Sequence, residues 1–116
     1  MRIRFALAAA AAAALLVATA AQAAPPKLVG TVGPGFTIVL KKGTAKVTKL
    51  KAGKYTFVIK DKSNIHNFHL KGPVGKMFTS VSFVGTKTVT LTLKKGKYSY
   101  VCDPHVGTMH GSFTVT

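Results

Sequence analysis

Short segments rich in β-branched and aromatic residues recur along the chain after residue 26, and glycine or proline turns separate them. The clearest alternation lies in 87–93, where Val89, Leu91 and Leu93 are interleaved with threonines. No stretch after residue 26 has the 3.6-residue period of a helix. Seven or eight short strands at regular spacing predict an all-β chain folded as a β-sandwich. The expected strands are 27–32, 36–41, 55–60, 65–70, 78–84, 87–93, 98–102 and 112–116, and 44–50 alternates weakly.

A short repeat in the sequence also predicts how the chain crosses between the two sheets. Leu50-Lys-Ala-Gly-Lys-Tyr55 is echoed by Leu93-Lys-Lys-Gly-Lys-Tyr98, and a strand follows each copy. The pattern is typical of a tyrosine corner, in which the phenol bonds back to upstream backbone where the chain crosses between sheets. Two such corners predict two Greek-key crossovers.

The first 23 residues have the layout of a secretory signal peptide. Arg2 and Arg4 precede an apolar run, and Ala21-Gln22-Ala23 suits cleavage after residue 23. The alternative is a membrane anchor, but the run is shorter than the ~20 residues that a spanning helix needs, and no later segment has that length. We therefore expect export to a periplasm or the cell exterior, and one mature domain over residues 24–116.

Positive charge dominates the composition, with 17 lysines and arginines against two acids, Asp61 and Asp103. Both arginines fall in the expected signal peptide, so the mature chain carries lysine alone. Nucleic-acid recognition favours arginine forks with interleaved aromatics, whereas these lysines are spread over strand ends and turns. We expect a solvated lysine surface that blunts strand edges, no nucleic-acid partner, and attraction to acidic partners or to an anionic surface.

The C-terminal segment holds a soft ligand set. Cys102 is the only cysteine, His105 follows three positions later and Met109 four beyond that. Pro104 cannot continue a strand, so the chain turns after Cys102 and both side chains can point at one centre. The alternatives for a single exported cysteine are a buried structural thiol or an intermolecular disulfide.

A second imidazole has to come from elsewhere in the chain. His66, at the start of the expected strand 65–70, is the best candidate; His69 is the competitor, on the opposite face. His110 would point away from Met109, and we expect His69 and His110 at the surface. Two histidines, a cysteine and a weak axial methionine suit copper in an electron-transfer site, whereas zinc would recruit a stronger fourth ligand than a thioether.

Two motifs carry a family resemblance. Asn64-Ile65-His66-Asn67 and Tyr100-Val101-Cys102-Asp103-Pro104-His105-x-x-x-Met109 resemble the blue-copper cupredoxins, in particular the plastocyanin, pseudoazurin and amicyanin group. The resemblance implies a Greek-key sandwich with one type 1 copper ion. It implies His66, Cys102 and His105 as equatorial ligands and Met109 as the axial ligand. It also implies that Asn67 hydrogen-bonds near the ligand loops and steadies the cysteine sulfur.

The expected function is single-electron transfer by Cu(II)/Cu(I) cycling between redox partner proteins, in a monomer. The alternative is copper storage, delivery or protection without a redox role. We expect no enzyme activity. Multicopper oxidases and nitrite reductases need further His-x-His pairs and a histidine next to the cysteine, where Asp103 stands. The binuclear copper site of cytochrome oxidase needs two cysteines.

Overall fold

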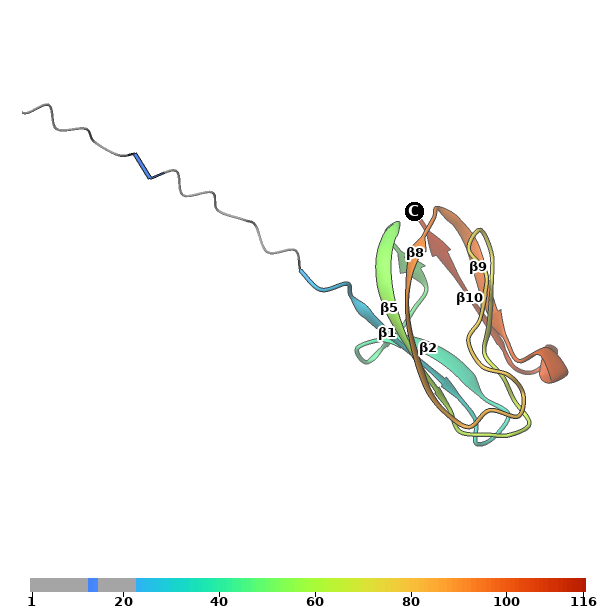
Figure 1. Cartoon of the computed structure of the whole chain (residues 1–116). Coiled ribbons are helices and arrows are strands. Elements are labelled where there is room, and N and C mark those ends of the chain that lie inside the picture. The colour runs from blue at the N-terminus through green and yellow to red at the C-terminus, as the bar shows by residue number, and fades with distance from the viewer. Residues whose placement is uncertain (1–12, 15–22) are drawn as a thin grey trace, which may run out of the picture.

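Two five-stranded sheets face each other in a sandwich (Figure 1), as a computed structural model shows. The structure describes residues 13–14 and 23–116, so nearly all of the expected signal peptide lies outside the described residues. One sheet has the strand order β3-β2-β1-β5-β8 and the other β4-β10-β9-β6-β7. The strands are β1 (Lys27–Val32), β2 (Ile38–Lys42), β3 (Ala45–Lys46), β4 (Lys49–Leu50), β5 (Gly53–Asp61), β6 (His69–Lys71), β7 (Lys76–Met77), β8 (Gly85–Leu93), β9 (Gly96–Val101) and β10 (His110–Val115).

Strand alternation places the core between the sheets. On β5, the side chains of Tyr55, Phe57 and Ile59 are buried, and the residues between them are less so. On β8, Leu93 is buried, and Val89 and Leu91 pack partly buried against the core while the threonines between them are exposed. The predicted β-sandwich is therefore confirmed. Among the described residues, no helix is long and apolar enough to span a membrane.

Both tyrosine corners are present. The Tyr55 hydroxyl donates to the Lys51 carbonyl at 2.7 Å. The Tyr98 hydroxyl donates to the Lys94 carbonyl at 2.7 Å and accepts from the Lys94 backbone N–H at 3.0 Å. These bonds fix the turns that precede β5 and β9. The opposite ends of both strands lead into the loops of the site described below.

Three strand expectations are wrong in detail. The expected strand 65–70 is reduced to β6, and residues 65–68 form a loop. No strand forms over 78–84, because the chain turns there with a Phe83 N–H to Ser80 carbonyl bond of 3.1 Å; β7 forms just before it. The weak segment 44–50 divides between the sheets, since β3 pairs with β2 and β4 pairs in parallel with β10.

The strand register distinguishes two ends of the sandwich. At one end, β5 and β9 finish and β10 begins. The expected ligand Cys102 directly follows β9 there, so we call this the metal end. At the other end lie the start of β5, the last residue of β10 and the turn between β8 and β9. In Figure 1 the short orange-red turn at 103–105 and the C-terminus lie at opposite ends of the sandwich.

Candidate metal centre

The turn after β9 brings Cys102 and His105 together. Cys102 has extended backbone, and a single 3₁₀ turn, Asp103–His105, follows with Pro104 in its first positions. The His105 N–H donates to the Cys102 carbonyl at 3.0 Å. As a result, Cys102 Sγ lies 3.5 Å from His105 Nδ1. The proline in the sequence predicted this turn.

His66 reaches the same point from the loop between β5 and β6. Its Nδ1 lies 3.1 Å from His105 Nδ1 and 3.6 Å from Cys102 Sγ. It sits in a loop, not at the start of a strand as the sequence suggested, because β6 begins only at His69. Both His66 and Cys102 are 0% exposed, whereas His105 is partly exposed.

These three donor atoms suit one soft transition metal. Two imidazole nitrogens and one sulfur all lie within 4.8 Å of one another. Two imidazoles and a thiol that converge on one point are the donor set that copper takes in blue-copper sites. His66, Cys102 and His105 are therefore the residues that would hold the ion.

Met109 closes the loop that carries Cys102 and His105. It is fully buried. Its N–H donates to the His105 carbonyl at 2.8 Å, and its carbonyl accepts from the Cys102 N–H at 3.0 Å. The backbone of Met109 is thus fixed against both residues, which makes a compact ligand loop between β9 and β10.

Asn67 ties this loop to the loop that carries His66. Its Oδ1 accepts from the Asp103 backbone N–H at 2.8 Å, and its Nδ2 donates to Asp103 Oδ2 at 2.8 Å. Nδ2 also lies 3.0 Å from Met77 Sδ. The hydrogen bonds of this buried amide therefore run to the residue directly after Cys102, where they fix the two loops relative to each other.

Asp103 is a site residue that the sequence reasoning did not assign. His69 Nδ1 lies 3.0 Å from Asp103 Oδ1, and Lys71 Nζ lies 3.9 Å from the same atom. Burial acts to raise the pKa of Asp103, but the hydrogen bonds from Asn67 and His69 and the charges of His69 and Lys71 outweigh it and hold the pKa below its usual value. His69 is thus engaged with Asp103 and stands apart from the three donor atoms.

Two further residues, His110 and Phe36, lie beside the ligand loop. His110 is exposed, and its Nδ1 bonds to the Val106 carbonyl at 2.8 Å. The Phe36 ring meets His66 and His105 edge-on, with ring centroids 5.2 and 5.0 Å apart, yet Phe36 is 60% exposed. The only sequence signal for Phe36 is its place after the Gly33-Pro34-Gly35 turn, which does not point to a metal site.

Asp61 is the last inward-facing residue of β5 and is only 2% exposed. Its Oδ1 accepts from the Ser63 N–H at 3.2 Å, while Oδ2 has no hydrogen-bond partner among the described residues. Burial raises the pKa of Asp61, although the nearby Thr79 hydroxyl, the Ser63 N–H and the charge of His66 oppose the shift. The core at the metal end therefore contains an incompletely satisfied carboxyl group.

Asp61→Asn is expected to flatten the fall in stability with rising pH. Because the folded-state pKa lies above the unfolded value, the folded state binds the proton more tightly, and stability falls as pH rises from the unfolded pKa through the folded one. Asparagine has no such proton and retains an oxygen for the Ser63 N–H. Urea unfolding of both metal-free proteins from pH 3 to 8 measures the slope in that range. Parallel curves would show that Asp61 has an ordinary pKa.

Comparison with known proteins agrees with the fold and the donor set. The sequence profile described as "Copper binding proteins, plastocyanin/azurin family" matches residues 36–116. Reduced rusticyanin is 26% identical with a TM-score of 0.52, covering 78% of each chain. A reduced amicyanin variant is 19% identical with a TM-score of 0.50, covering 82% of this chain and 87% of that one. No curated protein sequence matches the chain.

A Greek-key sandwich that brings His66, Cys102 and His105 together at one end defines a copper protein of the blue, or cupredoxin, class. Since the family profile matches most of the sequence, the chain belongs to the plastocyanin/azurin family of copper-binding proteins.

Proposed function

We propose that the protein is an exported, single-domain carrier of single electrons, and not an enzyme. In this proposal residues 1–23 are removed as a signal peptide, and residues 24–116 act in a periplasm or outside the cell. His66, Cys102 and His105 are the equatorial ligands of one type 1 copper ion, and Met109 is the weak axial ligand. Copper bound there supplies a one-electron Cu(II)/Cu(I) couple.

The observation that carries this proposal is the unequal exposure of the three donor residues. His66 and Cys102 are completely buried, so solvent and partner proteins reach neither of them. His105 is partly exposed. Exposed Phe36 contacts the His105 ring, and Val106, the next residue, is 47% exposed. The imidazole of His105 is therefore the route by which an electron leaves or enters the site.

The surrounding contacts suit a site whose charge changes while its shape does not. Asn67 joins the two ligand loops through both side-chain atoms, and the Cys102–Met109 backbone bond closes the second loop. Hydrogen bonds around the ligand loops fix the orientation of the ligands in this way. A ligand set held in this way needs little rearrangement on electron transfer, whereas a copper-delivery site has to open to release its ion.

Voltammetry of the copper-loaded protein tests the proposal. We expect the protein to bind one equivalent of Cu(II), turn blue, and give a reversible one-electron wave with no loss of copper over repeated cycles. The measurement is made with a Cu(I) chelator present, because a storage or delivery protein would surrender its copper to the chelator on reduction. Loss of the wave after the first reduction would contradict electron transfer and favour the copper-handling alternative.

A further inference from the structure

Charge is divided between the two ends of the sandwich. The only two acidic residues, Asp61 and Asp103, both lie at the metal end. Most of the lysines lie elsewhere. Strand pairing places Gly53 opposite Leu93, and Gly96 opposite Val115, so the segment before β5 and the turn between β8 and β9 share the end away from the metal site.

We call this the lysine end and define it by seven exposed lysines. Four fall between positions 42 and 54, two lie in the turn that joins β8 to β9, and one lies at the start of β9. They are Lys42, Lys49, Lys51, Lys54, Lys94, Lys95 and Lys97. No aspartate or glutamate lies among them, and a carboxylate at Thr116 would offset only one of these charges.

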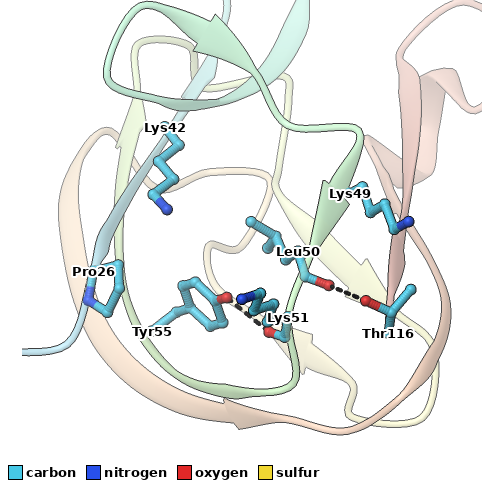
Figure 2. A pocket seen from close by; sticks show the side chains of 7 residues that line it. All are labelled: Pro26, Lys42, Lys49, Leu50, Lys51, Tyr55 and Thr116. Carbon is cyan, nitrogen blue, oxygen red and sulfur yellow. Dashed lines mark hydrogen bonds between the residues drawn. The ribbon is translucent and has the colours of Figure 1, made fainter.

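Three of these lysines line an open hollow of about 650 Å³. Leu50 and Tyr55 lie at its base with Pro26 beside them, and Lys49 and Lys51 flank Leu50 (Figure 2). The Lys42 side chain extends from β2 toward the hollow in the same view. The hydroxyls of Tyr55 and Thr116, which both line the hollow, donate to the carbonyls of Lys51 and Leu50, so the polar side-chain groups free to meet a ligand here are lysine ammonium groups.

The lysine end lacks the features of a protein-docking surface. Protein interfaces rely on aromatic, apolar or arginine anchors. The large hydrophobic residues that are exposed in the described part of the chain lie outside the lysine end; they are Phe36, Ile65, Met77, Val81, Val84 and Val106. Arginine is also absent from it. Lysine ammonium groups act as strongly hydrated point charges, which suits an extended anionic surface without a fixed pattern of acceptors.

We propose that the lysine end binds the anionic phospholipid headgroups of a membrane surface and leaves the metal end facing away from the membrane. Pro26, just before β1, also lines the hollow, so the described chain enters the domain on this side. The attraction is electrostatic and peripheral, because no exposed apolar side chain is available there to insert. The proposal does not depend on copper or on the proposed electron transfer.

Vesicle binding with charge-matched variants tests the proposal. Lys42→Gln/Lys49→Gln/Lys51→Gln is compared with Lys60→Gln/Lys62→Gln/Lys87→Gln, which removes the same charge near the metal end, where Lys60 pairs with Thr86 and Lys87 with Ile59. All chains carry the same N-terminal sequence. Sedimentation with phosphatidylcholine vesicles, with and without phosphatidylglycerol, gives the affinities.

We expect the first variant to bind phosphatidylglycerol vesicles roughly 100-fold more weakly than the unsubstituted chain, because each lysine near an anionic surface contributes about 1 kcal/mol. The second variant should lose less than tenfold, and added salt should weaken all binding. Acetylation of bound protein should spare Lys42, Lys49 and Lys51 while modifying Lys60 and Lys62. Equal losses in the two variants, equal acetylation at both ends, or no preference for phosphatidylglycerol would overturn the proposal.

Discussion

Cys102→Ser is expected to abolish the intense blue absorption of the Cu(II)-loaded protein. The colour of a blue-copper site comes from charge transfer between a cysteine thiolate and the metal, and Cys102 is the only cysteine in the chain. Its sulfur is buried and lies within 3.6 Å of both imidazole nitrogens, so no other group can take its place. Serine has no thiolate. The visible spectrum during titration with Cu(II) measures the loss, and circular dichroism shows whether the sheets remain.

Three further variants make this result specific. Cys102→Ala removes the donor without burying a hydroxyl, so it should be colourless even if the serine variant folds poorly. His69→Ala should stay blue because His69 contacts Asp103 and not the donor atoms, while His66→Ala should not. A serine variant that stays blue would refute the thiolate assignment. Bleaching by His69→Ala alone would show that the wrong histidine was chosen.

Local sequence patterns were enough to predict the part of the site that lies in one loop. Pro104 predicts the turn that brings His105 to Cys102, because proline cannot remain in the strand ladder. The sequence favours His66 for its place at the start of an expected strand, and strand alternation implies that His66 and His69 cannot both bind one ion, yet His66 lies in a loop. The structure separates the two histidines for a different reason, which is that His69 lies in β6 and is hydrogen-bonded to Asp103.

The contacts that fix the site come from residues far apart in sequence, and these were harder to predict. The Asn67–Asp103 bonds span 36 positions, and Phe36 meets His105 only because the β1–β2 turn folds over the metal end. No local sequence pattern predicts such contacts between residues far apart in the chain. The same limit explains the fold errors, since 44–50 changes sheets in order to pair with β10. Alternation alone predicts a strand but not its partner.

Gly111→Ala is expected to destabilise the whole domain by about 3 kcal/mol, at the upper end of the usual cost of overpacking. Gly111 lies directly opposite Tyr100 across β9 and β10, and the Tyr100 ring lies over it, so an added Cβ would overlap the ring. The ring has nowhere to go, because Tyr100 is fully buried and stacks on Phe68 with centroids 5.4 Å apart. For a small domain this is a large share of a total of about 5–15 kcal/mol.

Urea unfolding of the metal-free protein measures this loss, with Gly107→Ala as the matched control. Gly107 lies in the loop just before β10, and an added Cβ there meets nothing within 4 Å, so its substitution should change stability by less than about 0.5 kcal/mol. Tyr100→Leu removes the ring and leaves a cavity, but it also makes room at position 111. Adding Gly111→Ala to Tyr100→Leu should therefore cost much less than adding it to the unsubstituted chain, since residues in contact are not additive. If the two costs are equal, the Tyr100 ring is not what requires glycine at position 111.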